Sequence, residues 1–138
     1  MSLDGEWFNE LGSCMTLTTN GNSITGTYQT AVGDASGTYN LVGRTDAQSG
    51  GSQAVGFVVV WQNDYGNSKS VTTWSGQYQS IDGEEIIVTT WLLTQETEVS
   101  SDWKSTLVNK DVFTRHIPDQ EQIQERIRKG VQPSHGKR

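Results

Sequence analysis

The sequence predicts an all-β fold, an eight-stranded antiparallel up-and-down barrel with a short C-terminal tail that is helical or flexible. Short strand-like stretches follow one another up to residue 114, and no helical pattern separates them. Two strong hairpin signals, Asn20-Gly21 and Asp82-Gly83, each end a stretch. The chain has 15 Gly against two Pro, which is typical of many tight turns. Sequential antiparallel strands at this spacing favour a meander that closes on itself.

The expected strands are bounded by turn residues. Loops are expected at 31–36 and 48–52, and Asp64-Tyr65-Gly66-Asn67 reads as a turn. The expected strands are 5–9, 14–19, 23–30, 37–45, 53–63, 70–78, 85–94 and 103–114. A barrel of eight strands has an interior that side chains fill or that holds one small ligand.

The stretch 70–78 lacks the apolar face of an ordinary structural strand. One of its faces carries Ser70, Thr72 and Trp74. Buried hydroxyls without partners cost about 1–3 kcal/mol each, so we expect something to meet them. This pattern favours a strand that lines a ligand site.

Strands 53–63 and 85–94 are apolar on both faces. In an antiparallel sheet this predicts cover on both sides. A second copy of the chain is the simplest cover outside a barrel.

Residues 118–138 form a tail after the barrel domain expected over residues 1–117. Pro118 with early acids, late basic residues and Gly130 are helix start and stop signals. The narrow apolar stripe of this helix leaves open a frayed helix on solvent, a docked tail or an added assembly contact. From residue 133 to the end we expect disorder.

Charge and composition exclude several classes of partner. The net charge is -6 and the pI is near 4.7, which argues against nucleic acid and anionic membranes, because both attract clustered Lys and Arg. No apolar run approaches the roughly 20 residues of a membrane helix. The first residues do not read as a signal peptide, so we expect a cytoplasmic protein, or a secreted or periplasmic one if a leader was removed.

The sequence argues against an enzyme. His116 and His135 lie at the end of the barrel and in the tail, and Cys14 has no obvious base. Metal-ligand spacing, a nucleophile elbow and phosphate-binding glycine motifs are all missing, and no pair stands out among the 16 acids for glycoside chemistry. We expect no catalytic residue, no metal ligand and no cofactor.

Strand parity predicts the lining of the barrel. Its inward positions are Leu11, Ser13, Met15, Leu17, Ile24, Gly26, Tyr28, Thr30, Phe57, Val59, Trp61, Ser70, Thr72, Trp74, Trp91, Leu93, Asp111 and Phe113. Asp111 stands out, because a carboxylate inside a small barrel needs hydrogen-bond donors. The set predicts an apolar pocket with a few convergent polar groups.

Several segments of the chain resemble the avidin family, on the streptavidin side. They are Gly5-x-Trp7-Phe8-Asn9-x-Leu11-Gly12-Ser13, Gly26-Thr27-Tyr28, Thr72-Thr73-Trp74-Ser75-Gly76-Gln77-Tyr78, Trp91-Leu92-Leu93 and Trp103-Lys104-Ser105-Thr106-Leu107-Val108-x-x-Asp111-x-Phe113-Thr114. The match runs in order from about residue 5 to 115. The resemblance implies non-catalytic, high-affinity binding of biotin in the open end of the barrel.

The resemblance assigns residues to the ureido group of biotin. Asn9, Ser13 and Tyr28 fall where the family donates three hydrogen bonds to the ureido oxygen. Asp111 and Thr30 fall where the family accepts hydrogen bonds from the two ureido N–H groups. The ureido end of the site is therefore expected to be intact.

The resemblance also assigns the rest of the ligand. Thr72 matches the hydroxyl near the ring sulfur, and Ser70 with the backbone N–H of Asp34 matches the groups that hold the valerate carboxylate. Trp103 matches the tryptophan that enters a neighbouring subunit's pocket. The apolar wall of the candidate site consists of Val32, Trp61, Trp74, Trp91 and Leu93.

The chain departs from the family pattern at a few positions. Thr30 replaces a Ser, and Asp34 stands where Asn is usual, which puts a carboxylate near that of the ligand unless Lys69 offsets it. Lys110 stands where streptavidin has a histidine at a two-fold contact, so symmetry would bring two lysines together. We expect a homo-oligomer, a tetramer, with a dimer or a higher assembly left open by Lys110 and the tail.

Two other functions remain open at this point. One is a lipocalin-like carrier of another small apolar ligand, which Gly5-Glu6-Trp7 fits and the polar inward set does not. The other is a structural or assembly protein whose barrel is filled by its own side chains.

Overall fold

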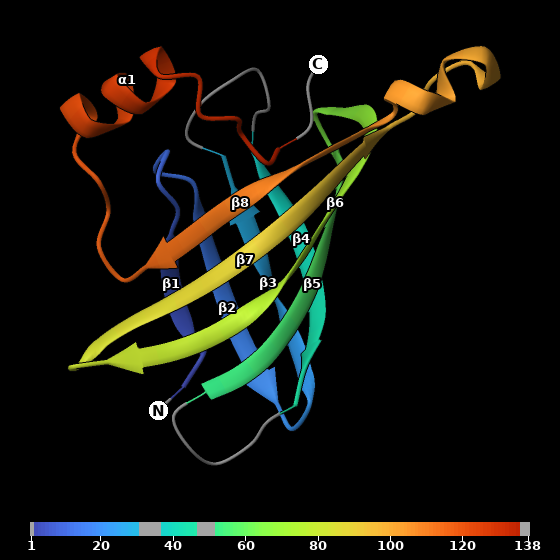
Figure 1. Cartoon of the computed structure of the whole chain (residues 1–138). Helices are drawn as coiled ribbons and strands as arrows, with labels where there is room; N and C mark the ends of the chain where they lie inside the picture. Colours follow the sequence, from blue (N-terminus) through green and yellow to red (C-terminus); the bar gives the residue numbers. More distant parts are fainter. Residues whose placement is uncertain (1, 31–36, 47–51, 136–138) are drawn as a thin grey trace.

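The computed structural model describes residues 2–30, 37–46 and 52–135, and its strands form a closed antiparallel barrel (Figure 1). Each strand pairs with the next one in sequence, and β8 returns to pair with β1. The strands are β1 (Gly5–Phe8), β2 (Cys14–Asn20), β3 (Ser23–Gln29), β4 (Thr38–Thr45), β5 (Ser52–Asn63), β6 (Gly66–Ile81), β7 (Glu84–Gln95) and β8 (Thr106–Thr114). The predicted up-and-down barrel of eight strands is confirmed.

The two predicted hairpins form, each with a two-residue turn. Asp82 and Gly83 both have positive φ, 53° and 82°, which is the requirement of a type I′ turn. Between β2 and β3 the turn lies one residue later than expected. Asn20 still pairs with Ser23, and Gly21, with φ 62°, is the first turn residue.

The connection between β7 and β8 differs from the expectation. The predicted eighth strand began near Trp103, but a 3₁₀ helix, η1 (Val99–Lys104), precedes β8. Ser105 N–H closes this helix with a 3.0 Å bond to the Asp102 carbonyl oxygen. Such short helices carry no periodic signal in sequence, because one or two turns present no repeating face.

The interior of the barrel is the hydrophobic core. Trp74 lies between two rings, with its centroid 5.0 Å from Phe57 and 5.3 Å from Tyr28, and both pairs are stacked. The inward positions expected from parity are buried, except Gly26 and Thr30, which are half-buried. The predicted lining is thus confirmed at the level of which side chains face inward.

The second apolar face of the sheet lies outside the barrel. Val42, Val60, Leu92 and Val108 are each about half exposed or more, at 54%, 51%, 48% and 63%. In the single chain these side chains face solvent, so burying them requires a partner surface.

Glycine permits the close approach of β6 to β7. A Cβ placed on Gly76 would overlap the Val88 carbonyl oxygen and crowd Thr89. Gly66, at the start of β6, has nothing within 4 Å of such an atom. The two glycines therefore form a matched pair for testing backbone contact.

A Gly76→Ala variant should lose about 1–3 kcal/mol of unfolding free energy, because the strands must separate to admit the methyl group. A Gly66→Ala variant should stay within about 0.5 kcal/mol of the native chain. Urea unfolding of both variants measures the difference. Equal stability of the two would contradict the close strand contact.

The predicted C-terminal helix forms as α1 (Gln120–Arg128). Its N-cap is Asp119, whose side chain accepts the Gln122 N–H at 2.8 Å while the Gln122 side chain accepts the Asp119 N–H at 3.0 Å. This reciprocal pair is a capping box, which satisfies two otherwise unpaired N–H groups. No helix in the described part of the chain is both long and apolar enough to span a membrane.

Of the alternatives left open for α1, the structure shows the docked helix. Ile123 is only 4% exposed, and Arg126 Nη1 donates a 2.6 Å hydrogen bond to the Glu10 carbonyl oxygen. Figure 1 shows α1 beside one end of the barrel.

The chain beyond α1 differs from its prediction. We expected disorder from residue 133, whereas Ser134 and His135 are 1% and 4% exposed. They find polar and aromatic partners inside the barrel end, which a composition argument could not foresee. Residues 136–138 lie outside the described residues.

Candidate ligand site at the end of the barrel

Asn9 is held in one orientation by the turn that follows β1. Its Oδ1 accepts the N–H groups of Leu11 at 3.1 Å and Ser13 at 3.0 Å. The amide nitrogen, Nδ2, therefore points the other way and donates to the Tyr28 hydroxyl at 3.3 Å. Asn9 and Ser13 are 3% and 1% exposed, so this turn places a buried N–H donor and a buried hydroxyl side by side.

Tyr28, on β3, is a neutral hydroxyl at all ordinary pH values. Burial, and next the negative charge of Asp111, raise the pKa of its phenol far above the usual value of 10. Hydrogen bonds with Ser134 and Ser13 oppose this shift only in part. Tyr28 therefore keeps a proton to donate.

Asp111, on β8, is a buried carboxyl group with a fixed partner. It is 2% exposed, and its Oδ2 accepts a 2.9 Å hydrogen bond from Trp74 Nε1. Burial, and then the charge of Glu10, raise the pKa of Asp111 to about 7, against the lowering effect of bonds from Trp74 and Ser134. The group can accept a hydrogen bond from a ligand more strongly once it is ionised.

The raised pKa of Asp111 predicts a pH-dependent stability. The usual pKa is 3.8 and the folded value is about 7, so between these values the fold holds a proton that the unfolded chain has released. Unfolding free energy should fall as pH rises through this window, because the folded state binds more protons there than the unfolded state does.

An Asp111→Asn variant removes this ionisation and keeps an oxygen for Trp74. Relative to the native chain, it should gain stability when the pH is raised from roughly 4 to roughly 8. Chemical denaturation of both proteins at the two pH values gives the comparison. A difference that does not change with pH would contradict the raised pKa.

Thr72 and Ser70 place hydroxyls along the inward face of β6. Trp61 Nε1 donates to Thr72 Oγ1 at 2.8 Å. The Ser70 and Ser68 hydroxyls are hydrogen bonded at 2.8 Å, and Ser68 Oγ donates to the Trp61 carbonyl oxygen at 3.2 Å. The predicted need of these buried hydroxyls for partners is thus met partly by the protein itself.

Three indoles and one leucine line this interior. Trp61, Trp74, Trp91 and Leu93 are each 1% exposed or less. Trp61 lies edge-on to Tyr28 with centroids 5.4 Å apart. Trp91 Nε1 is buried and has no hydrogen-bond partner among the described residues. Its indole therefore presents an unsatisfied N–H as well as an apolar wall.

The other predicted site residues are Thr30, Val32, Asp34 and Trp103. Thr30, just after β3, is half-buried. Trp103 lies on η1 and is 84% exposed, so it does not contribute to the interior of its own barrel. Val32 and Asp34 are outside the described residues.

Glu10 and the residues Ser134 and His135 lie at the site and were missed by sequence reasoning. Glu10 Oε1 accepts the Val112 N–H at 2.8 Å and acts electrostatically on Asp111. Strand parity directs Glu10 away from the interior, so no signal marked it. The tail residues follow a helix and have no pattern that links them to a barrel.

Residues considered for catalysis are not arranged for it. Burial, and then Glu6, raise the pKa of the Cys14 thiol, which opposes a nucleophilic thiolate. His116 is exposed just beyond the end of β8. No group of three His, Cys, Asp or Glu side chains among the residues described could hold a metal ion.

The closed eight-stranded barrel with its buried, partly polar interior belongs to the class of small barrels whose interior is either filled by side chains or holds one small ligand. The Avidin family model matches residues 1–116, and the chain belongs to the avidin family. The proteins of this family are binders without catalytic activity, so the chain is not an enzyme.

Individual relatives agree with this assignment. The chain is 38% identical over 120 residues to avidin-related protein 4/5 of Gallus gallus, covering 83% of this chain and 77% of that protein. It is 35% identical over 127 residues to avidin of the same species, covering 83% and 78%. Afifavidin of Afifella pfennigii is 36% identical over 121 residues, covering 79% and 71%.

Proposed function

We propose that this protein binds biotin non-covalently and with high affinity at the end of its barrel. The observation that carries the proposal is the convergence of Tyr28, Thr72 and Asp111 on one buried space. All three interact with the same small residue, Ser134. A ligand in that space would meet a hydroxyl donor and a carboxylate at once.

The ureido group of biotin fits these groups chemically. Its oxygen would accept from Asn9 Nδ2 and from the hydroxyls of Ser13 and Tyr28, which lie next to one another. Asp111 would accept one ureido N–H and Thr30 the other. Donors on the oxygen and an anion on the N–H polarise the urea together, and charge-assisted bonds are about twice as strong as neutral ones.

The rest of biotin is assigned to the residues along β6 and to the indoles. Thr72 would lie by the ring sulfur, and Ser70 with the backbone N–H of Asp34 would hold the carboxylate. The rings of Trp61, Trp74 and Trp91 would enclose the bicyclic ring, with Val32 and Leu93 as further apolar contacts. A rigid barrel needs little ordering on binding, which reduces the entropic cost.

The proposed functional form is a homo-oligomer, with a tetramer as the expected state. The exposed apolar outer face supports an assembly, and Trp103 would close the pocket of a neighbouring copy. Lys110 is exposed on β8, so a two-fold contact there would bring two ammonium groups together. Light scattering measures the mass, and a monomer would remove Trp103 from the proposed site.

The deciding experiment is a biotin titration followed by tryptophan fluorescence and thermal unfolding. Biotin should change the emission of the buried indoles and raise the melting temperature, since a ligand of the folded state stabilises it by RT ln(1 + [L]/Kd). Lipoic acid is the matched control, because it has a sulfur ring and a pentanoate chain but no ureido group.

Each outcome of this titration has a definite meaning. A response to biotin alone supports the ureido assignment. An equal response to lipoic acid would favour a carrier of small apolar acids. No response to either would favour a barrel filled by its own side chains.

A further inference from the structure

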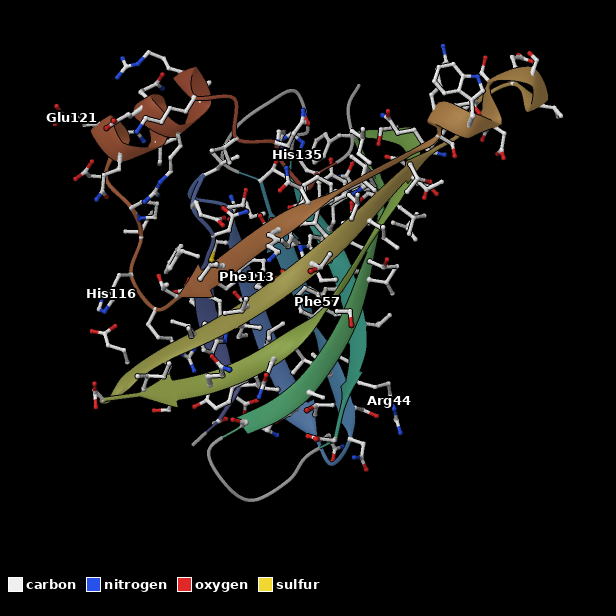
Figure 2. The ribbon with its side chains drawn as sticks, viewed as in Figure 1. Arg44, Phe57, Phe113, His116, Glu121 and His135 are labelled. Carbon is white, nitrogen blue, oxygen red and sulfur yellow. The ribbon has the colours of Figure 1, made fainter. Side chains whose placement is uncertain are left out.

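The segment after α1 returns to the barrel and enters its end. Gly130, with φ 79°, turns the chain out of the helix. Four residues later Ser134 is 1% exposed, and His135 is 4% exposed. Figure 2 shows His135 at the barrel end near α1, far from Arg44 at the opposite end. The tail is therefore part of the interior and not a surface appendage.

Ser134 forms polar contacts with the groups that define the candidate site. Thr72 Oγ1 donates to its carbonyl oxygen at 2.5 Å, and its hydroxyl is hydrogen bonded to the Tyr28 hydroxyl at 3.4 Å. A hydrogen bond from Ser134 also lowers the pKa of Asp111, against the stronger effect of burial. A peptide carbonyl and a hydroxyl thus give this site an acceptor and a donor within one residue.

His135 adds an aromatic contact. Its ring lies edge-on to Trp61, with centroids 6.3 Å apart and planes at 79°. Edge-to-face aromatic pairs are favourable beyond their buried area, because the positive edge of one ring meets the negative face of the other. Ser134 therefore hydrogen bonds to the polar groups of the site, and His135 packs against one of its indoles.

The tail is tethered close to the site by the docked helix. Ile123 packs against the protein, and Arg126 donates to the Glu10 carbonyl oxygen. A short tether of this kind gives a millimolar effective concentration, so even a weak peptide contact is well populated.

From these contacts we infer that the barrel end is also a peptide-binding site, whose resident ligand is the segment 133–135 of its own chain. This inference rests on the proposed function only where it predicts competition with biotin. A small ligand that uses Tyr28, Thr72 and Asp111 must displace Ser134. The apparent affinity is then the intrinsic affinity multiplied by the fraction of molecules whose tail is out of the site.

The test uses a full-length variant with Pro133, Ser134 and His135 all changed to glycine. It should bind the synthetic peptide acetyl-Val-Gln-Pro-Ser-His-amide, detected by tryptophan fluorescence and calorimetry. The native chain should not, because its own segment is already bound. Gln124→Ala, an exposed position on α1, is the control and should behave as the native chain does.

The competition arm compares biotin association in the same three proteins by stopped-flow fluorescence. Biotin should associate with the glycine variant about tenfold faster than with the native chain and the control. Peptide binding to the variant, with release by biotin, supports the inference.

Other outcomes separate the inference from the proposed function. No peptide binding by the glycine variant, with biotin binding equal in all three proteins, would overturn the inference and leave biotin binding intact. Peptide binding without any biotin binding would support the peptide site and contradict the proposed function. If occupation of the barrel end by the tail depended on protein concentration, the tail would be binding to another copy. That result would overturn the inference that segment 133–135 binds within its own chain.

Discussion

An Asp111→Ala variant should bind biotin about 10²- to 10³-fold more weakly than the native chain, because truncating one member of a buried charged hydrogen bond costs about 2–5 kcal/mol. The carboxylate is 2% exposed, and its place would be taken by a methyl group that accepts nothing. A ureido N–H would then be buried without an acceptor, which adds a desolvation penalty. Displacement titration with a labelled biotin measures the dissociation constants.

Two further variants make the Asp111 result specific. Asp111→Asn keeps a neutral oxygen and should fall between the native chain and Asp111→Ala. Glu84→Ala removes an acid that is exposed on the first residue of β7 and should leave affinity unchanged. Circular dichroism checks that the barrel is intact in each. If Asp111→Ala keeps native affinity, the ureido assignment is wrong.

Local rules predicted the barrel well, because each of them acts between neighbouring residues. The Asp82-Gly83 hairpin needs positive φ at both turn positions, and the structure has them. Period-two alternation selected the inward side of β6, and Ser70, Thr72 and Trp74 are indeed buried. A hydroxyl-bearing inward face is unusual in a structural strand, so alternation favoured β6 as a strand that lines a ligand site, and that role stays a prediction.

The parts that sequence reasoning missed depend on contacts between distant segments. Glu10 affects Asp111 across a separation of about 100 residues, and parity alone directs it away. Ser134 reaches Thr72 only because α1 docks on the barrel and sets where the tail begins. Composition predicted a disordered end, because a composition argument considers the tail alone and ignores the residues that the tail contacts in the folded chain.

The resemblance to a family supplied what alternation left open. Alternation predicted polar and aromatic lining but no particular ligand. The family assigned roles to Asn9, Ser13 and Thr30, and the structure brings the first two together beside Tyr28. The role of each residue toward biotin stays a prediction until the variants are measured.

A Trp103→Ala variant should weaken biotin binding about 30- to 1,000-fold in the assembled protein, the range for losing a buried tryptophan hot spot of about 2–4 kcal/mol. In the single chain this indole is 84% exposed on η1 and contacts solvent. An exposed side chain of this size gains most from burial against another copy, where it would cover the ligand. Affinity and light scattering should be measured on the same samples.

The control for Trp103 comes from its own helix. Val99 is 93% exposed on η1, so Val99→Ala removes apolar surface without the indole and should leave affinity unchanged. A Leu92→Glu and Val108→Glu double variant places charges on the exposed outer face and should dissociate the assembly. Adding Trp103→Ala to that dissociated protein should cost nothing further. An equal loss in the assembled and dissociated backgrounds would show that Trp103 acts within its own chain, and the proposed exchange between copies would be wrong.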